Sequence, residues 1–226
     1  MPADLSIILF VYNEEAGLEP VLRELLDYLE SAPFRAEIVF VDDGSSDQSL
    51  ALARSILPRE RTQFARHETN RGIGAALKTG ASIARGKYLS FLPGDGQLPP
   101  ETLGRLYAAR EGADLVCSVY EARRRDGALR KLLSAGVRGL IQLVHGVKME
   151  SDGPYLIRRS LFAPEQLESE SFFLNFEVPI RAHAAKLEIR VVPADCRPRL
   201  HGSSKTANIR TTAKVALDLI RLRLRR

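Results

Sequence analysis

The chain has 226 residues, of which 45% are apolar and 27% are charged, and this ordinary globular composition excludes a disordered or fibrous protein. Lys and Arg number 33 against 28 Asp and Glu, so the formal net charge is +5. That charge favours an anionic partner such as a phosphate, a nucleotide, an anionic lipid or a nucleic acid. The two cysteines, Cys117 and Cys196, imply neither a disulfide framework nor a structural zinc site.

The opening segment, MPADLSIILFVYNEE, lacks a basic start and soon turns polar, which is not typical of a signal peptide. No apolar run in the sequence reaches the roughly 18 residues of a membrane span. We therefore expect a cytoplasmic protein, either soluble or attached peripherally to the inner face of the membrane.

Strands and helices are expected to alternate over the first half of the chain. Continuous apolar runs predict strands buried on both faces, and apolar residues at helical spacing separate them. The predicted strands are 5–11, 38–41, 63–66, 88–92 and 114–119, and the predicted helices are 14–31, 48–57, 73–84 and 99–110. This alternation predicts an α/β fold with a Rossmann-like, doubly wound, mostly parallel sheet and helices on both faces.

The second half of the chain has a different pattern of apolar and basic residues. Helices are expected at 129–144 and 176–185, a strand at 189–192, a basic loop at 197–205 and a final basic helix at 209–226. No repeat or linker is evident, which favours one domain.

Polar turns follow three of the predicted strands, and ligands of open parallel sheets bind beyond the carboxyl ends of the strands. The turns are Tyr12–Glu15, Asp42–Asp47 and Pro93–Gln97, and we expect them to converge on one crevice. For Asp47 we favour helix capping. For Asp43 and Asp95 we favour function, because a carboxylate after a buried strand is costly unless a ligand or metal pairs with it.

A glycine-rich segment, Asn70–Ala76, is similar to a phosphate-binding turn but lacks a complete fingerprint. An equally good interpretation is that its glycines permit a tight turn and close helix packing.

Five motifs in order (YNEE, VDDGSSD, NRGIGAALKTG, GDGQ and a late R-x5-K loop) resemble glycosyltransferase family two. The resemblance is greatest to the dolichyl-phosphate mannose synthase and polyprenyl-phosphate glycosyltransferase group, and it covers about Leu5 to Lys205. It implies a GT-A fold over residues 1–208, followed by the basic amphipathic helix 209–226. It also implies an NDP-sugar donor, a divalent metal (Mg or Mn) and inversion at the anomeric carbon.

The resemblance also assigns roles to residues of this sequence. Asp95 is implied as the catalytic and metal-binding carboxylate, with Gln97 as a second oxygen ligand. Arg199 and Lys205 match a basic loop that closes over the diphosphate, although a solvated surface loop is the alternative. The residues implied to bind the nucleotide-sugar are Tyr12, Glu14, Val41, Asp43, Asp95, Arg199 and Lys205.

Three positions depart from the family pattern. Pro93 stands where the family usually has an aspartate, so metal binding is expected to be weakened, and a metal-independent or degenerate protein stays open. Phe10 replaces a usual proline, which we expect to be tolerated. Val119 stands where polyprenyl-phosphate members often carry an arginine.

The acceptor side is less defined. Arg130 and Ser134 match the pair that binds a lipid phosphate in polyprenyl-phosphate members, and their spacing places them on one helix face. An amphipathic helix with an exposed arginine is the alternative. A phosphate acceptor needs no general base. For a hydroxyl acceptor, Asp152 and Glu177 are the candidate bases, and the segment containing Asp152 is implied to line the acceptor side.

The terminal segment places apolar residues along one helical stripe, flanked by arginines: Ala213, Ala216, Leu217, Ile220 and Leu224. Such a helix can lie on an anionic membrane surface or pack on the domain.

These observations favour an inverting enzyme that moves a hexose from an NDP-sugar to polyprenyl (dolichyl or undecaprenyl) phosphate. The alternatives are transfer to a hydroxyl acceptor and a degenerate, non-catalytic sugar-nucleotide binder. No nucleic-acid partner is expected, because aromatic and basic residues do not interleave.

Overall fold

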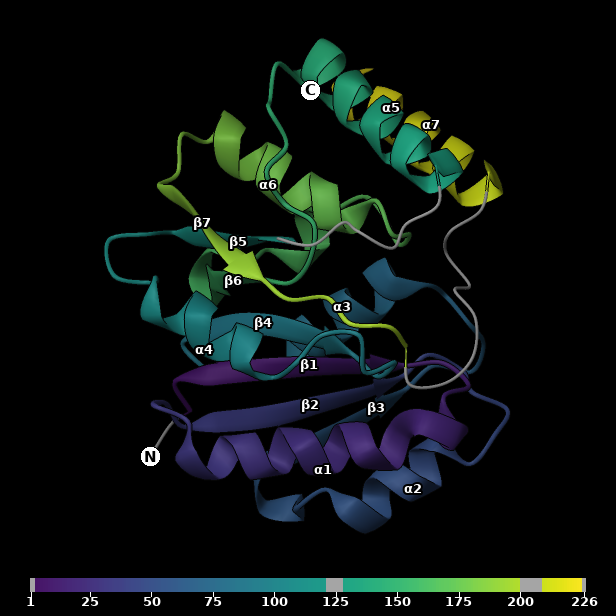
Figure 1. The fold of residues 1–226 in the computed structure, drawn as a ribbon, viewed down its shortest axis with the longest axis vertical. Helices are drawn as coiled ribbons and strands as arrows, with labels where there is room; N and C mark the ends of the chain where they lie inside the picture. The colour runs from purple at the N-terminus through teal and green to yellow at the C-terminus, as the bar shows by residue number, and fades with distance from the viewer. Residues whose placement is uncertain (1–2, 121–127, 200–208, 225–226) are drawn as a thin grey trace.

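The computed structural model describes residues 3–120, 128–199 and 209–224, whose strands form one seven-stranded sheet with helices on both faces (Figure 1). The strand order is β3-β2-β1-β4-β6-β5-β7. The strands are β1 Leu5–Val11, β2 Ala36–Asp42, β3 Thr62–Arg66, β4 Tyr88–Pro93, β5 Leu115–Tyr120, β6 Tyr155–Arg158 and β7 Ile189–Ala194. Only β6 runs antiparallel to its described neighbours, β4 and β5. The expected α/β class with a mostly parallel sheet is confirmed.

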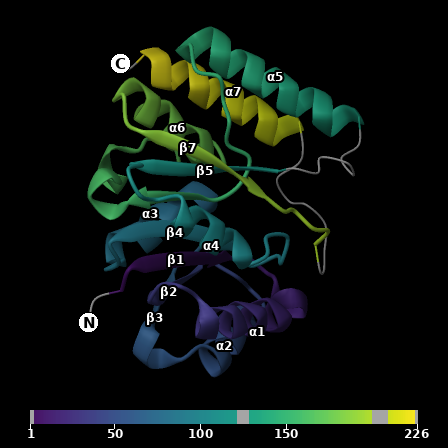
Figure 2. The ribbon, with the colours of Figure 1, turned by 60° about the vertical axis from the view of Figure 1, so that its left-hand side comes forward.

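The helices are α1 Glu15–Ser31, α2 Ser49–Ile56, α3 Ile73–Ile83, α4 Glu101–Ala108, α5 Ala128–His145, α6 Leu174–Ala184 and α7 Ile209–Leu224. Short 3-10 turns lie at Arg59–Arg61, Arg159–Leu161 and Pro164–Gln166. Helices α1, α2 and α4 cover one face of the sheet, and α3 and α6 cover the other. Helices α5 and α7 lie side by side at the end of the molecule farthest from α1 and α2 (Figures 1 and 2).

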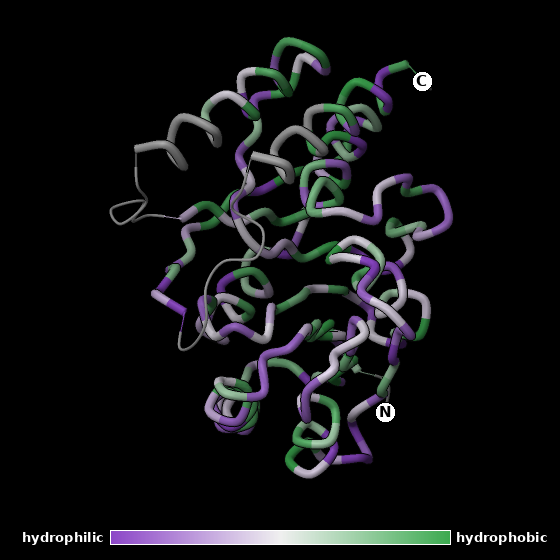
Figure 3. The backbone as a smooth tube through the Cα atoms, turned by 90° about the vertical axis from the view of Figure 1, so that its right-hand side faces the viewer, coloured by the Kyte–Doolittle hydropathy of each residue, from purple (hydrophilic) through white to green (hydrophobic). Residues whose placement is uncertain are grey.

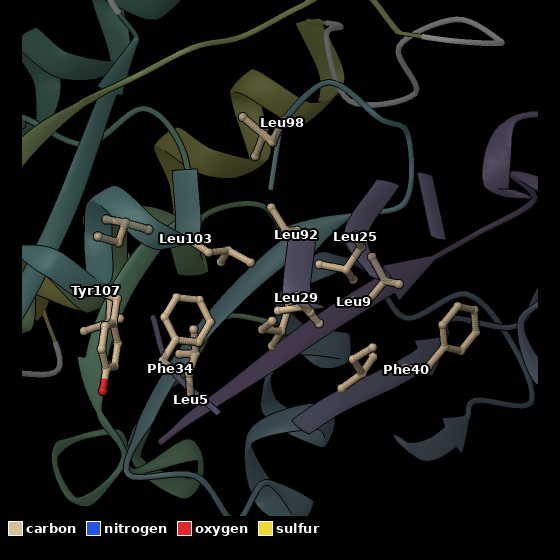
Figure 4. Packing of buried hydrophobic residues seen from close by; sticks show 14 of the residues in the cluster. Leu5, Leu9, Leu25, Leu29, Phe34, Phe40, Leu92, Leu98, Leu103 and Tyr107 are labelled. Atoms are coloured by element: carbon tan, nitrogen blue, oxygen red, sulfur yellow. The ribbon is translucent and has the colours of Figure 1, made fainter. Parts of the chain in front are cut away.

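Alternate residues of β1 supply the two main hydrophobic cores. Leu5 and Leu9 pack with α1 and α4 on one face (Figure 4), whereas Ile8 packs with α3 on the other. A strand covered on both faces has apolar side chains at successive positions. Figure 3 shows hydrophobic segments of the backbone in the middle of the molecule, where the sheet lies. Each fully buried leucine contributes about 1.5–3 kcal/mol to the free energy of unfolding.

The second core also contains Cys117, and burial raises the pKa of its thiol to about 12. This cysteine is therefore a structural residue, since the thiolate is the reactive form.

A third core joins α5, α6 and α7. It includes Ile141 of α5, Ile180 of α6 and Leu219 of α7, all fully buried. His145 Nε2 lies 3.0 Å from the Leu219 carbonyl oxygen, which also links α5 to α7.

The buried side of α7 is formed by Val215, Leu219 and Leu222, not by the stripe that the sequence singled out. Of that stripe, Leu217, Ile220 and Leu224 are exposed. No helix among the described residues is both long enough and apolar enough to cross a membrane. The division of the chain at residue 208 stays a prediction, because residues 200–208 lie outside the described ranges.

Candidate functional site

Strands β1, β2 and β4 end in register at one edge of the sheet, where Val11 pairs with Asp42 and Phe10 pairs with Pro93. The turns that follow them border a cavity of about 790 Å³. The cavity is lined from these turns by Tyr12, Glu14, Asp43, Pro93, Gly94, Asp95 and Gln97. The predicted convergence of three polar turns on one crevice is therefore confirmed. It lies beyond the carboxyl ends of the strands, near the point where the strand order reverses between β1 and β4.

The first two turns are locked together by reciprocal hydrogen bonds. The Asn13 side chain accepts from the Ser46 backbone N–H at 2.8 Å, and Ser45 Oγ accepts from the Asn13 backbone N–H at 3.0 Å. Asp47 accepts from the backbone N–H groups of Ser49 and Glu15, the first residues of α2 and α1. The capping role favoured for Asp47 is confirmed, and the backbone that carries Tyr12 and Glu14 is held in place.

Asp43 is buried, and its carboxylate is satisfied inside the protein. It accepts from the backbone N–H groups of Arg71 at 2.9 Å and Gly72 at 2.8 Å, and it lies 2.7 Å from His67 Nδ1. The argument that this carboxylate needs a ligand or metal is therefore wrong, although Asp43 lines the cavity. Its contact with a nucleoside stays a prediction.

The glycine-rich segment packs tightly against a neighbouring loop. Gly72 has φ +98°, and a Cβ at Gly74 would lie 2.6 Å from the carbonyl carbon of Glu170. The tight-turn and close-packing interpretation of these glycines is confirmed. Asn70, Arg71 and Gly72 also line the cavity.

Arg199 lies between the carboxylates of Asp95 and Glu14 and joins them into a charged group of three side chains. Arg199 Nη2 is 3.0 Å from Asp95 Oδ2, and Arg199 Nη1 is 3.5 Å from Glu14 Oε1. All three side chains line the cavity, and each is less than one-fifth exposed. Arg199 Nε is also buried and has no hydrogen-bond acceptor among the described residues. A guanidinium held there favours an anionic ligand.

The segment that carries Arg199 is fastened to the turn that carries Asp95. The Arg197 backbone N–H donates to the Gln97 carbonyl at 2.9 Å, and Arg197 Nε donates to the Gly96 carbonyl at 2.6 Å. Arg197 also forms a hydrogen-bonded ion pair with Glu24, and the hydrogen bond to Glu24 raises the pKa of the Arg197 guanidinium. The part of the basic loop up to Arg199 is therefore attached to the turn that borders the cavity. Lys205 lies outside the described residues.

Asp95 and Gln97 are the oxygen-bearing side chains of this turn that fit a divalent metal. Asp95 Oδ1 accepts from the Gln97 backbone N–H at 3.0 Å, which orients the carboxylate. Within the described residues, no three His, Cys, Asp or Glu side chains form a group that could hold a metal. One carboxylate and one amide are a partial ligand set, and Mg²⁺ usually completes such a set with substrate phosphates and water. The donors therefore fit a metal that a diphosphate also binds.

The cavity is also lined by residues from the second half of the described chain and from the end of β5: Tyr120, Asp152, Gly153, Ser171, Phe172 and Asn175. Asp152 thus lies on the same cavity as Asp95, and its place on the acceptor side stays a prediction. Its carboxylate forms an ion pair with Arg138 of α5. Arg130 and Ser134 lie earlier in the same helix, but their side chains lie outside the described part of the chain.

Two expected site residues lie elsewhere. Val41 is fully buried between α3 and the sheet and does not line the cavity, so its side chain offers no surface to a nucleoside. Glu177 is also fully buried, and it accepts from the backbone N–H groups of Glu168 and Ser169 and pairs with Arg181. The expectation that Glu177 is a candidate general base is therefore wrong.

The sequence analysis missed His67 and Arg138. His67 lies behind Asp43, with Nε2 2.9 Å from Thr79 Oγ1, and no motif distinguishes it from a core histidine. The sequence spacing could have revealed Arg138, because Arg130, Ser134 and Arg138 follow one another at intervals of four residues.

Comparison with known proteins agrees with this geometry. The family model described as Glycosyl transferase family 2 matches residues 6–176. An undecaprenyl-phosphate 4-deoxy-4-formamido-L-arabinose transferase of Pseudomonas paraeruginosa is 36% identical over 219 residues, covering 92% of this chain and 62% of the relative. A dodecaprenyl-phosphate galacturonate synthase of Rhizobium johnstonii is 30% identical over 225 residues, covering 96% of this chain and 65% of the relative. The chain spans about three-fifths of the length of these relatives.

Among solved structures, glucosyl-3-phosphoglycerate synthase from Mycobacterium tuberculosis has a similar fold. Its complex with Mn²⁺, UDP and phosphoglyceric acid matches with a TM-score of 0.73 and 20% identity, covering 98% of this chain and 78% of that one. Its complex with Mg²⁺ and UDP matches with a TM-score of 0.69 and 20% identity, covering 98% of this chain and 79% of that one. The expected GT-A-type fold is confirmed by this likeness.

Proposed function

Since this chain belongs to glycosyl transferase family 2, we propose that it transfers a hexose from an NDP-sugar to polyprenyl phosphate, with inversion at the anomeric carbon. The observation that carries this proposal is the cavity in which Glu14, Asp43, Asp95 and Arg199 meet. The names of the two relatives, an undecaprenyl-phosphate 4-deoxy-4-formamido-L-arabinose transferase and a dodecaprenyl-phosphate galacturonate synthase, support a polyprenyl-phosphate acceptor.

On the donor side, Tyr12, Glu14 and Asp43 line the part of the cavity that would hold the nucleoside. Breaking the glycosidic bond places additional negative charge on the leaving diphosphate. Arg199 is a fixed cation at this position, and Lys205 is proposed as a second one. Cations positioned where charge develops lower the barrier.

Asp95 and Gln97 are proposed to hold Mg²⁺ or Mn²⁺ with the diphosphate. A metal there would supply Lewis-acid stabilisation of the leaving group. Pro93 removes one carboxylate from the turn, so we expect weaker metal binding than a turn with two carboxylates would give. In this arrangement, the Asp95 carboxylate has two competing partners, the metal and the Arg199 guanidinium.

On the acceptor side, a phosphate is already anionic and attacks without a general base. Arg130 and Ser134 of α5 are proposed to bind that phosphate. The ion pair of Asp152 with Arg138 supports an acceptor that needs no base, since the carboxylate is engaged by a cation.

The exposed side of α7 suits the surface of a membrane that carries such an acceptor. It combines the apolar residues Leu217, Ile220 and Leu224 with Arg221 and Arg223. We propose that this side contacts the anionic inner face of the membrane peripherally.

The proposal is tested by incubating the protein with Mg²⁺ or Mn²⁺, a panel of labelled NDP-sugars and a short polyprenyl phosphate. The expected product is a glycolipid that carries the label through a phosphodiester. Transfer only to hydroxyl acceptors would reject this acceptor class. Metal-insensitive nucleotide binding without turnover would instead support a non-catalytic binder.

A further inference from the structure

One ion pair connects α5 to the wall of the cavity. Arg138 of α5 pairs with Asp152, and their side chains are 22% and 10% exposed. Arg138 Nη1 also donates to the Met149 carbonyl at 3.3 Å. Arg138 therefore holds both the side chain that lines the cavity and the segment that leads to it.

Asp152 joins this helix to the end of β5. Its carboxylate accepts from the Tyr120 backbone N–H at 3.3 Å, and its own backbone N–H donates to the Ser118 carbonyl at 2.8 Å. The next residue, Gly153, packs so closely that a Cβ there would lie 2.8 Å from the Tyr120 hydroxyl oxygen. The corner at Asp152 is thus held firmly against β5.

Arg130, Ser134 and Arg138 follow one another at four-residue intervals in α5. At 3.6 residues per turn, such positions lie along one side of a helix. The Arg138 side chain lies on that side of the helix and contacts Asp152. Helix α5 packs mainly against α7 among the described elements, and the ion pair with Asp152 is a polar contact that α5 makes with the segment bordering the sheet.

We propose that Arg138 is a positioning residue of the acceptor site, whose ion pair with Asp152 sets how α5 lies against the cavity wall. The pair holds the positions of Arg130 and Ser134 where a phosphate can approach the sugar donor. Asp152 acts in this arrangement as the counterion of Arg138, and not as a general base. The inference rests on the proposed function, because it assigns Arg138 to the acceptor half of that reaction.

The test compares Arg138→Met, Arg138→Lys, Asp152→Asn and the double variant Arg138→Met/Asp152→Asn. Misplacing a reacting group by about 1 Å costs roughly 100-fold in rate, so kcat/KM for polyprenyl phosphate should fall roughly 10- to 100-fold in Arg138→Met. The KM for the NDP-sugar should stay unchanged, and Arg138→Lys should restore part of the loss. The double variant should be no worse than the more severe single variant, since both changes break one interaction.

Arg158→Met is the matched control, because Arg158 pairs with Asp114 and neither residue lines the cavity. It should leave both KM values unchanged. Circular dichroism and the affinity for UDP establish that each variant is folded. Affinity for a short polyprenyl phosphate in the presence of UDP, measured by calorimetry, gives a readout that does not depend on turnover.

The inference would be overturned if Arg138→Met lowered kcat/KM equally for the NDP-sugar and for polyprenyl phosphate. It would also be overturned if both kcat/KM and the affinity for polyprenyl phosphate stayed unchanged in this variant. An Asp152→Asn variant that loses kcat while Arg138→Met keeps it would overturn the inference as well, because Asp152 would then act as a base. A wild-type protein that binds polyprenyl phosphate without transferring sugar would refute the proposed function, and the binding measurements on the variants would still decide the role of Arg138. A wild-type protein that does not bind the lipid phosphate would refute both.

Discussion

The half of the molecule built from β1 to β4 and the half that contains α5, α6 and α7 position their cavity residues differently. In the first half, Tyr12, Glu14, Asp43 and Asp95 each lie within three residues of the end of a strand, and hydrogen bonds from backbone N–H groups fix the turns. In the second half, Asp152 is held by its ion pair with Arg138 of α5 as well as by the Tyr120 backbone N–H at the end of β5. The turns of the first half hold one another at neighbouring strand ends, whereas the part of the cavity at Asp152 also depends on an ion pair with helix α5. Variants in the two halves should therefore affect donor and acceptor separately.

The largest effect is expected from Asp95→Asn. Removing the carboxylate takes away the charged group that we propose as metal ligand and one of the two carboxylates that pair with Arg199. Removing one such electrostatic group typically costs about 10²- to 10³-fold in kcat, which a transfer assay with labelled NDP-sugar measures. Asp27→Asn, on the exposed side of α1, is the control and should behave as wild type. An Asp95→Asn variant with wild-type activity would show that the metal site lies elsewhere.

Arg199→Ala is expected to weaken nucleoside diphosphate binding roughly 10- to 100-fold, because hydrogen bonds to charged groups contribute about 1.5–3 kcal/mol. The same change should strengthen the binding of Mn²⁺ alone, since Asp95 loses the guanidinium that competes with the metal. Calorimetry with UDP, GDP and TDP measures the first effect, and electron paramagnetic resonance of Mn²⁺ measures the second. The exposed Arg59→Ala is the control. If Arg199→Ala weakened the binding of the nucleoside diphosphate and the binding of Mn²⁺ equally, the competition between the metal and the guanidinium for Asp95 would be disproved.

Gly74→Ala tests the packing that shapes the rim of the cavity. The added Cβ would lie 2.6 Å from the backbone of Glu170, so the loop must shift. Overpacking of this kind costs about 1–3 kcal/mol, measured as a loss in the free energy of unfolding in urea. Gly139→Ala is the control, since a Cβ there meets nothing within 4 Å. Equal stability of the Gly74 variant and the wild type would contradict the close-packing interpretation.

The smallest effect on stability is expected from Leu217→Ser and Leu224→Ser, which lie on the exposed side of α7. Exposed substitutions usually change the free energy of unfolding by less than about 0.5 kcal/mol. Co-sedimentation with vesicles that contain anionic lipid should nevertheless fall, because apolar area on the membrane side is lost. Unchanged co-sedimentation of the double variant would argue against this side as the membrane contact.

The difference between the two halves also explains what the sequence could predict. The strand runs and the polar turns of the first half are local features, so the sheet and the convergence of Glu14, Asp43 and Asp95 could be predicted from them. The antiparallel pairing of Tyr155–Arg158 depends on where the chain returns after α5, and the sequence analysis left that segment unassigned. The partners of Asp43 and Asp152, His67 and Arg138, meet them only through tertiary contacts. Val41 was assigned by resemblance, and only its place in the sheet reveals that it faces a core.

The central claim is that Glu14, Asp43, Asp95 and Arg199 surround one site for a nucleoside diphosphate. Calorimetric titration of the wild type with UDP, GDP and TDP in the presence of Mn²⁺ tests it most directly. The account predicts that one of these nucleotides binds with a stoichiometry of one and that Asp95→Asn and Arg199→Ala both weaken its binding about tenfold or more, the change that about 1.4 kcal/mol produces. Absence of binding by all three nucleotides, or equal affinity in both variants and the wild type, would contradict it.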